Sequence, residues 1–304
     1  MVGLNHIAPV ISIVTVNFNG TRDTLELLES ISKASFKKLE VIVVDNASNE
    51  DPTNAIHAQF PDVRVIRSQK NLGFAGGNNL GIKEAKGAYV MLLNNDTVVD
   101  KNFAGPIVKA FEQHPEVGIV GSKIRFLHSP GILQYAGSTK MNPYTLTSFA
   151  IGWGEDDKGQ YDKAGYTHLA HGAAMTVSRK SIQSAGLMED AYFLYYEELD
   201  WCLQIQKAGF AIWFEPQSMV HHKESMSVGK SSPLQEYYKT RNRIFLARRN
   251  FKGLTRILCI LYLVLIANPI HLVKKVIKGQ TQMARAQFRG LMWHLNPQKF
   301  TFKS

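Results

Sequence analysis

The apolar residues of this chain fall into short continuous runs separated by longer amphipathic stretches. The run Tyr89–Leu93 is bounded by polar turn formers and is too short for a helix, so it predicts a strand buried on both faces of a sheet. Similar strands are predicted at Ile11–Val16, Leu39–Val44, Val63–Arg67 and Val117–Lys123. Helices are predicted between them at Thr21–Ser32, Pro52–Gln59, Gly76–Lys86 and Lys101–His114. This alternation predicts an α/β fold of βαβ units, with a mostly parallel sheet and helices on both of its faces.

The alternation ends after Gly121. Residues 126–165 are rich in Gly, Tyr, Asp and Ser and contain no long periodic segment, which predicts loops and short strands of the kind that often carry function. Further elements are predicted as strands at Ala170–Val177 and Ile212–Phe214 and as helices at Arg179–Ala185, Glu197–Lys207 and Ser231 to about Asn250. We therefore expect an N-terminal tail over residues 1–9, one α/β domain over residues 10–230 and a C-terminal helical region over residues 231–304. The α/β domain is expected to consist of two halves, about residues 10–125 and 126–230.

The positive charge of the chain is concentrated at its C-terminal end. The net charge is +10, and residues 241–304 contain 13 Lys and Arg but no Asp or Glu. The first 240 residues carry 22 basic and 25 acidic residues and are close to neutral. A near-neutral body with a basic end predicts an anionic partner, either nucleic acid or the anionic surface of a membrane.

The same C-terminal region is also strongly apolar. The run Ile257–Ala267 is followed by Asn268-Pro269 and then by Ile270–Ile277, with lysines nearby. The first run is shorter than the ~20 apolar residues of a membrane-spanning helix, and short apolar segments with basic flanks suit helices that lie in the interface of an anionic membrane. A nucleic-acid surface would interleave basic and aromatic residues, so no nucleic-acid partner is expected. The alternatives are a core helix or a contact between copies in a homo-oligomer.

Cysteine usage and the N-terminal residues predict the compartment. Cys202 and Cys259 are far apart, and their spacing indicates neither a disulfide framework nor a zinc site. The N-terminal residues lack a basic segment followed by an apolar core, so we expect no secretion signal. Together with the basic apolar C-terminal region, this predicts a cytoplasmic protein that is peripheral on the inner face of the cell membrane.

Polar side chains follow several predicted strands at the point where each strand ends. Asp45 and Asp96 both come directly after buried strands, and Thr15 and Asn17 lie at the end of the first strand. The carboxyl ends of parallel strands meet at the edge of the sheet where α/β folds bind ligands. A carboxylate such as Asp96 can hold a divalent cation, which in turn can hold a diphosphate. The alternative is that Asn94-Asn95-Asp96 only forms a turn.

A glycine-rich segment lies between these strand ends. Residues Asn71–Ile82 contain four glycines in a predicted loop that opens a helix, where the backbone can approach a ligand and free N–H groups can bind an anion. The segment matches neither the dinucleotide-binding fingerprint nor the P-loop motif. The alternative is that the glycines only permit tight packing.

Acidic and histidine residues in the second half complete the candidate chemistry. Glu197, Glu198 and Asp200 crowd the first turn of a predicted helix, where the helix dipole alone would favour them. One of them could instead act as a general base, because crowding and partial burial raise a carboxyl pKa. His221 and His222 end an extended segment and could bind a metal as neutral imidazoles, or be structural.

Seven motifs in one order resemble a known enzyme family. They are ISIVTVNFNG, VIVVDNAS, NLGFAGGNNLGI, YVMLLNNDT, the HGAAM segment from His171, YYEELDWCLQIQKAGF and HHKESMSVGK. Over about residues 10–250 the chain is similar to family-2 glycosyltransferases of the bacterial rhamnosyltransferase-like branch, which have a GT-A fold. The resemblance implies that residues 10–230 form a catalytic domain, with a nucleotide-sugar half and then an acceptor half.

The resemblance also implies roles for the candidate residues. Asp45 would recognise the base of a nucleoside diphosphate sugar. The other expected donor-binding residues are Thr15, Asn17, Asn71, Gly73, Gly76, Asn94 and Asn95. Asn94–Asp96 matches the DxD segment of the family, but its first aspartate is Asn94 here, so Asp96 is expected to be its sole carboxylate ligand. His222 would complete the metal site, with His221 as the fallback.

Glu198 matches the catalytic base of the family, where Asp is more usual. Glu197, Trp201 and His171 are expected to border the acceptor or the donor sugar. The implied reaction is an inverting single displacement that needs Mg²⁺ or Mn²⁺. The expected donor is dTDP-rhamnose, or else a UDP-sugar, and the expected acceptor is a lipid-linked saccharide in cell-surface polysaccharide biosynthesis.

Two other functions remain open at this point. A nucleotidyltransferase shares a nucleotide-binding α/β sheet but would place a basic residue in its glycine-rich loop, and Asn71–Ile82 contains none. A non-catalytic membrane-associated scaffold would not need Asp45, Asp96 and Glu198, all of which are present.

Overall fold

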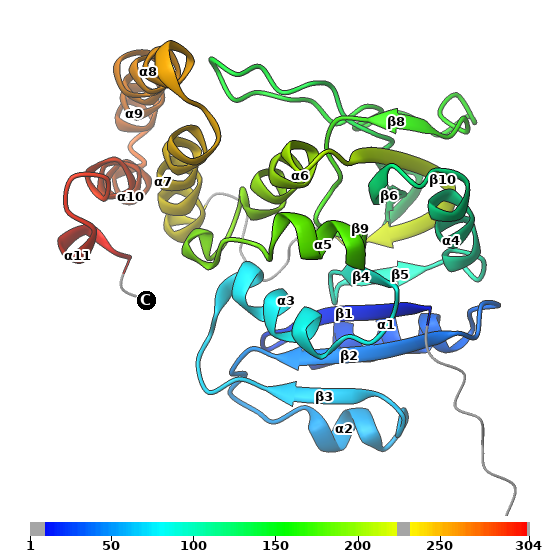
Figure 1. Cartoon of the computed structure of the whole chain (residues 1–304). Coiled ribbons are helices and arrows are strands. Elements are labelled where there is room, and N and C mark those ends of the chain that lie inside the picture. The colour runs from blue at the N-terminus through cyan, green and yellow to red at the C-terminus, as the bar shows by residue number, and fades with distance from the viewer. Residues whose placement is uncertain (1–9, 224–231, 303–304) are drawn as a thin grey trace, which may run out of the picture.

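The computed structural model describes residues 10–223 and 232–302; the predicted tail over residues 1–9 and most of the HHKESMSVGK motif lie outside them. Ten strands form one sheet with helices packed around it, and the C-terminal helices gather at one side (Figure 1). The strand order is β3-β2-β1-β4-β9-β6-β10-β5, and β7 and β8 pair with β6 and β10. The strands are β1 (Ile11–Asn17), β2 (Leu39–Asp45), β3 (Arg64–Arg67), β4 (Tyr89–Leu93), β5 (Thr97–Val99), β6 (Val117–Phe126), β7 (Ser129–Tyr135), β8 (Gly165–Thr167), β9 (Ala174–Ser178) and β10 (Ala211–His222).

The helices of the sheet domain cover both of its faces. They are α1 (Thr21–Ser32), α2 (Thr53–His57), α3 (Gly73–Glu84), α4 (Ala104–Gln113), α5 (Arg179–Ala185), the short 3₁₀ helix η1 (Asp190–Tyr192) and α6 (Glu197–Lys207). Apolar residues of α1 and α4 share one buried cluster with alternate residues of β1, such as Ile11 and Ile13. Residues of α3, α5 and α6 share the other cluster with Val14, on the opposite face of the same strand. The predicted α/β class with helices on both faces is confirmed.

The parallel part of the sheet matches the sequence prediction closely. β1 pairs in parallel with β2 and β4, and β2 pairs in parallel with β3. β1, β2 and β4 are short and apolar, and their central residues are mostly buried, as continuous apolar runs predict, whereas β3 is only partly buried. Their carboxyl ends therefore bring Asn17, Asp45 and Asn94–Asp96 to one edge.

The second half of the sheet is mixed, where a mostly parallel sheet is predicted. β9 lies between β4 and β6 and is antiparallel to both. A parallel strand needs a crossover connection, usually a helix, whereas β9 is reached from the long irregular segment after β7. β10 is also much longer than the predicted Ile212–Phe214. Its register shifts between Glu215 and Met219, around a proline that has no N–H to donate, and pairing then resumes as far as His222.

The C-terminal region is a group of packed helices. They are α7 (Pro233–Asn250), α8 (Gly253–Tyr262), the π-helical segment η2 (Leu263–Ala267), α9 (Asn268–Ile277), α10 (Thr281–Met292) and α11 (Pro297–Phe300). α7 lies against α10, and the approach is close at Gly290, where a Cβ would lie 2.6 Å from the carbonyl oxygen of Tyr237. α7 also contacts α6, so this region is packed against the sheet domain.

The apolar helix of this region is longer than the run Ile257–Ala267, because it continues through Asn268-Pro269. A continuous helix over Gly253–Ile277 is formed by α8, η2 and α9, and it is long and apolar enough to cross a membrane. Only 17% of its most apolar 18-residue stretch is buried in the protein. The π-helical turn widens the helix just before Pro269, and the Asn268 side chain donates to the Leu263 carbonyl oxygen at 2.9 Å. Such local widening is a usual way to accommodate a proline.

Candidate functional site

Asp45 lies at the carboxyl end of β2 and is fully buried. Asn17, opposite it at the end of β1, donates from Nδ2 to Asp45 Oδ1 at 3.0 Å and is itself fixed by Thr24, whose hydroxyl donates to Asn17 Oδ1. Arg67 donates from Nε to Asp45 Oδ2 at 3.2 Å. The Asp45 carboxylate is therefore held rigidly at the sheet edge, with its charge compensated and its side chain fully buried.

Thr15 sits inside the sheet rather than at its edge. It is fully buried two residues before Asn17, and its hydroxyl has no partner among the described residues. Its side chain shares the face of β1 that α1 covers, because Ile13 on the same side belongs to the cluster formed with that helix. Thr15 can therefore support Asn17 from below, but the structure does not bring it to the pocket surface.

The glycine-rich segment is mostly helical, not a loop. α3 begins at Gly73, three residues before the predicted start, and its first turn is fixed by Asn46, which donates from Nδ2 to Asn71 Oδ1 and to the Gly73 carbonyl oxygen, both at 3.0 Å. Gly77 and Gly81 face β1, and a Cβ on Gly81 would lie 2.3 Å from Val14. For these two glycines the packing alternative is correct.

Gly73 and Gly76, both predicted to bind the donor, are also in close contact with protein atoms. A Cβ on Gly73 would lie 2.1 Å from the carbonyl oxygen of Phe193, and its φ is +70°. A Cβ on Gly76 would lie 2.8 Å from Leu72. Packing therefore accounts for Gly73, whereas Gly76 also lines an open cavity together with Asn71. Asn71 remains exposed and lines an open cavity of about 390 Å³ beside Lys70 and Lys83.

The side chain of Asp96 meets that of His222 beyond the ends of β4 and β10. Asp96 Oδ1 lies 3.2 Å from His222 Nε2, and both residues are less than a tenth exposed. His222 Nδ1 donates to Gln134 Oε1 at 2.8 Å, which leaves the lone pair of a neutral imidazole on Nε2. Asn94 Nδ2 lies 3.4 Å from the same nitrogen. Two acceptors, a carboxylate oxygen and an imidazole nitrogen, thus face the same point.

This pair fits a divalent cation. Two neighbouring ligands at ~2.1 Å from an octahedral ion lie ~3 Å apart, which agrees with the observed separation. Within residues 10–223 and 232–302, no group of three or more His, Cys, Asp or Glu side chains is arranged to hold a metal. The remaining ligands would be water and the oxygens of a bound diphosphate, as is usual for Mg²⁺.

The neighbours of the pair point elsewhere. His221 Nε2 lies 3.0 Å from Asp100 Oδ1, so the fallback ligand is engaged away from Asp96. Asn95 Nδ2 donates to Thr24 Oγ1 at 3.2 Å and to the Gly20 carbonyl oxygen, and so braces the loop after β1. His222 is therefore the histidine that the geometry favours.

His171 lies beside His222, with ring centroids 6.2 Å apart. Its Nδ1 accepts the Ala173 N–H at 3.1 Å, so the neutral ring carries its proton on Nε2. Burial, reinforced by His222, lowers the pKa of His171 to about 3, so it stays neutral at physiological pH. A neutral N–H donor next to the Asp96–His222 pair could bind a sugar hydroxyl or a phosphate oxygen.

Glu197 and Glu198 begin α6 and are both deeply placed. Each has a buried Oε2 without a partner among the described residues. Burial raises the pKa of Glu198, and it raises that of Glu197 well above the ordinary value, with the Glu198 charge adding to the effect. Glu198 packs against Gly172, next to His171. A carboxyl group with a raised pKa and one buried oxygen free of partners among the described residues, next to the segment that carries His171, has the properties of a general base.

Two other residues of this helix have structural roles. Asp200 accepts from Arg249 Nε at 2.9 Å and from Asn250 on α7. Trp201 was expected to border a sugar, but it is 1% exposed, lies in the main core and donates from Nε1 to the Gly186 carbonyl oxygen. It faces inward because it lies one turn beyond Glu197, on the side of α6 that covers the sheet.

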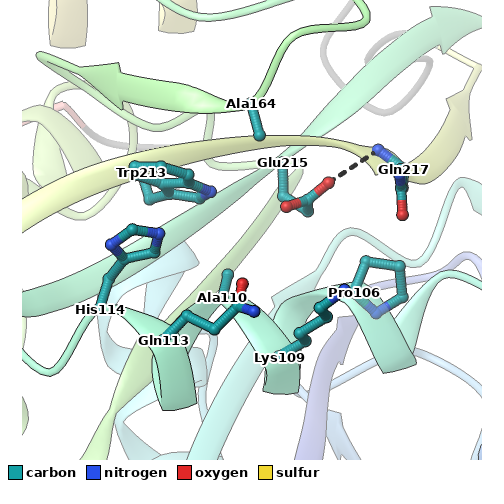
Figure 2. Close-up of a pocket in the computed structure, with 9 residues that line it drawn as sticks. All are labelled: Pro106, Lys109, Ala110, Gln113, His114, Ala164, Trp213, Glu215 and Gln217. Carbon is teal, nitrogen blue, oxygen red and sulfur yellow. Dashed lines mark hydrogen bonds between the residues drawn. The ribbon is translucent and has the colours of Figure 1, made fainter.

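A smaller cavity of about 190 Å³ lies between α4 and β10 (Figure 2). It is lined by Pro106, Lys109, Ala110, Gln113, His114, Ala164, Trp213, Glu215 and Gln217. None of the candidate site residues is among them. The candidate site is therefore the sheet edge formed by β1, β2, β4 and β10 with the start of α6.

Sequence reasoning missed Arg67, Asn46 and Gln134. Arg67 could have been found, because it ends the predicted third strand at the same edge as Asp45. Asn46 directly follows Asp45 but looks like an ordinary turn residue. Gln134 is 88 residues from His222 and lies in the segment without a readable pattern, so nothing in the sequence indicates their contact.

Several solved structures share this fold. A mannosyltransferase from Pyrobaculum calidifontis, in complex with GDP-Man and Mn²⁺, aligns with a TM-score of 0.60 at 15% identity over 95% of this chain and 88% of the other. GalNAc-T7 with UDP, GalNAc and Mn²⁺ aligns with a TM-score of 0.62 at 17% identity over 80% of this chain and 51% of the other. The fold is that of GT-A glycosyltransferases, as the sequence predicts.

Sequence relatives point the same way. The chain is 26% identical over 253 residues to the low-salt glycan biosynthesis hexosyltransferase Agl10 of Haloferax volcanii, which covers 81% of this chain and 78% of that protein. It is 26% identical over 258 residues to the uncharacterized protein y4gI of Sinorhizobium fredii, but spans only 28% of that protein. The family model named glycosyl transferase family 2 matches residues 12–182, more than half of the chain. The chain therefore belongs to glycosyl transferase family 2.

Proposed function

We propose that this protein is an inverting glycosyltransferase that moves a sugar from a nucleoside diphosphate sugar to an acceptor hydroxyl. The observation that carries the proposal is the proximity of two groups through the segment His171-Gly172: the His171 ring lies 6.2 Å from that of His222, which faces Asp96, and Gly172 contacts Glu198, whose Oε2 is buried without a partner among the described residues. A diphosphate site and a general base are the two parts that an inverting single displacement needs.

Each residue has a distinct task in the proposed reaction. Asp45, held by Asn17 and Arg67, accepts hydrogen bonds from the base of the donor. Asp96 and His222 would hold Mg²⁺ or Mn²⁺, and the bound cation would supply charge neutralisation for a diphosphate leaving group. Glu198 takes the proton of the acceptor hydroxyl as that oxygen attacks the anomeric carbon from the face opposite the diphosphate.

The surroundings of Glu198 suit this task. Burial raises the pKa of Glu198, which contacts Gly172 and has a buried Oε2, so the carboxylate is a stronger base than in solution. Because Glu198 lies in the first turn of α6, the start of this helix fixes where the carboxylate can meet the acceptor hydroxyl. His171 remains neutral and donates from Nε2, which suits a contact to a sugar hydroxyl.

The donor is proposed to be a dTDP- or UDP-sugar, with dTDP-rhamnose favoured by the sequence resemblance. Similar solved structures are complexes with GDP-Man, UDP or UDP-GlcNAc, so enzymes of this fold accommodate guanine as well as uracil. The test is a panel of nucleoside diphosphates and nucleotide sugars with and without Mn²⁺, read by the thermal unfolding midpoint. We expect one base to raise the midpoint in a cation-dependent way. A flat response across the whole panel would contradict a donor site at this edge.

The acceptor is proposed to be a lipid-linked saccharide at the cytoplasmic face of the membrane, in cell-surface polysaccharide biosynthesis. The support is the helix Gly253–Ile277, which carries large exposed apolar side chains and is followed by basic residues. Its buried residues Cys259, Leu263 and Ala267 belong to the same apolar cluster as residues of α7. Since one side of the helix is covered by protein, an interfacial position suits it better than a fully lipid-surrounded span.

The membrane proposal predicts the effect of charging the exposed side of this helix. Leu261 and Leu265, 46% and 65% exposed, lie one turn apart, and the double change to Glu should lower binding to anionic phospholipid vesicles more than tenfold, because it removes two apolar contacts and adds negative charge. Flotation with vesicles measures this. Leu295→Glu is the control, since Leu295 is 76% exposed but lies outside the helix. Equal flotation of the double variant and wild type would refute the interfacial role.

A further inference from the structure

The chain immediately before Glu197 has an unusual backbone. Phe193, Tyr195 and Tyr196 have φ values of 62°, 69° and 76°, so three of the four residues 193–196 have a positive φ although none is glycine. A positive φ is unfavourable for residues with a side chain and persists only where the surroundings impose it. Tyr196 is also the residue from which α6 starts. The conformation of residues 191–196, which we call the α6-entry loop, therefore sets the direction in which the Glu197 and Glu198 side chains leave the backbone.

Two adjacent residues of α7 hold the α6-entry loop. Asn242 Nδ2 lies 2.9, 2.8 and 2.8 Å from the carbonyl oxygens of Tyr192, Leu194 and Tyr195. Arg241 donates to the carbonyl oxygens of Ala191 and Tyr192. Arg241 Nε also donates to Asn242 Oδ1 at 2.7 Å, which fixes the orientation of the carboxamide so that its N–H groups face the loop.

Every carbonyl oxygen from Ala191 to Tyr195 thus has a donor, and four of the five are served by Arg241 and Asn242. The fifth, that of Phe193, accepts the Phe74 N–H at 2.6 Å. Asn242 is fully buried and Arg241 is 5% exposed. Buried carbonyl groups without donors are costly, so the loop depends on these side chains for its conformation.

Arg241 is itself held in place by residues of the C-terminal helical region. The Arg241 guanidinium lies 4.6 Å from the ring centroid of Tyr238 and 4.9 Å from that of Trp293. His294 Nε2 lies 2.9 Å from the Arg241 carbonyl oxygen. The same helical region carries the apolar helix Gly253–Ile277, so the α6-entry loop is connected to the region proposed to contact the membrane.

We propose that Asn242, fixed by Arg241, is a positioning residue for the catalytic base: it holds the α6-entry loop in the conformation that points Glu198 at the acceptor. This inference rests on the proposed role of Glu198. It assigns to the C-terminal helical region a part in catalysis that is separate from membrane binding. A displacement of about 1 Å at a catalytic group can reduce turnover about 10²-fold.

The test is Asn242→Asp, which keeps the shape and the acceptor for Arg241 but replaces the N–H groups by an oxygen facing three carbonyls. We expect kcat to fall about 10²-fold per folded, donor-binding molecule, with the KM for the donor within about threefold of wild type. Asn242→Ser retains one donor and should lose less activity than Asn242→Ala. The Ser and Ala variants also provide the reading if the Asp variant does not fold.

The matched control is Gln287→Glu. Gln287 is another buried carboxamide of the same helical region, but it donates to Asn268 between α10 and α9. This change should lower the unfolding midpoint and leave kcat per folded molecule unchanged. If the control lowers kcat as much as Asn242→Asp, or if the Asn242 variants turn over at the wild-type rate, the positioning role is wrong.

Glu198→Gln is measured in parallel and separates the two levels of the proposal. An inactive Glu198→Gln with fully active Asn242 variants overturns the positioning role alone, and the proposed function stands. A fully active Glu198→Gln overturns the proposed base, and with it the reason to position the loop.

Discussion

Replacing Glu198 by Gln is expected to lower kcat by about 10²- to 10⁴-fold, the range that a general base usually contributes. Gln has nearly the same shape but cannot take the proton of the acceptor hydroxyl. In the proposed site the nucleotide is held by Asp45 and the Asp96–His222 pair rather than by Glu198, so the Kd of the donor should remain within about threefold of wild type. Initial rates and donor binding by calorimetry give the two values.

The pH dependence of the wild type gives a second reading of the same residue. The base must be ionised, and burial raises the pKa of Glu198 above 4.5. The rate should therefore fall as the pH is lowered through that raised pKa, which places the acidic limb above pH 4.5. An acidic limb at or below pH 4.5 would indicate an exposed carboxylate and a different base.

Asp200→Asn is the matched control for Glu198→Gln. Asp200 is a carboxylate in the same helical turn, but it pairs with Arg249 and Asn250. Its loss should destabilise the fold, because breaking a buried pair leaves the partner groups unsatisfied, while the folded protein keeps its kcat. Near-normal turnover of Glu198→Gln would remove Glu198 from the mechanism.

Replacing Asp96 by Ala is expected to have the second large effect, a loss of about 10²- to 10³-fold in kcat/KM together with the response to added Mn²⁺. Asp96 is the only carboxylate of its motif, and the described residues contain no third acidic or histidine ligand beside it and His222. His222 alone would hold a cation weakly, so the diphosphate would leave without charge neutralisation. Rates over a Mn²⁺ titration measure both losses.

His221→Ala is the control for this experiment. His221 adjoins His222 but pairs with Asp100, so its loss should leave the Mn²⁺ dependence unchanged. His222→Ala should resemble Asp96→Ala. If Asp96→Ala retained full Mn²⁺-dependent activity, the cation would have to bind elsewhere.

The parallel half of the fold could be predicted because its signals are local. Each short apolar run, such as Tyr89–Leu93, becomes a buried strand, and each polar strand end, such as Asp45 or Asp96, reaches the same edge. The end of β10 was harder to predict. Glu215 and Pro216 look like the end of a strand, and only pairing with β6 and β5 extends the strand to His222.

The features that could not be predicted depend on contacts between distant segments. Asn46 starts α3 early by binding Asn71 and Gly73, which turns an expected loop into a helix. Asn242 holds a loop that lies about 50 residues before it, and no local pattern indicates this. Trp201 looks exposed beside three carboxylates, yet the packing of α6 on the sheet buries it.

The central claim is that the Asp96–His222 edge and Glu198 act together to transfer a sugar from a nucleotide. The most direct test is to incubate the purified protein with the nucleotide sugar that stabilises it, Mn²⁺ and a lipid-linked saccharide, and to identify the phosphorus-containing product by ³¹P NMR. We predict the release of nucleoside diphosphate, in equal amount to the sugar transferred and with inversion at the anomeric carbon. Release of pyrophosphate, or transfer with retention of configuration, would contradict this mechanism.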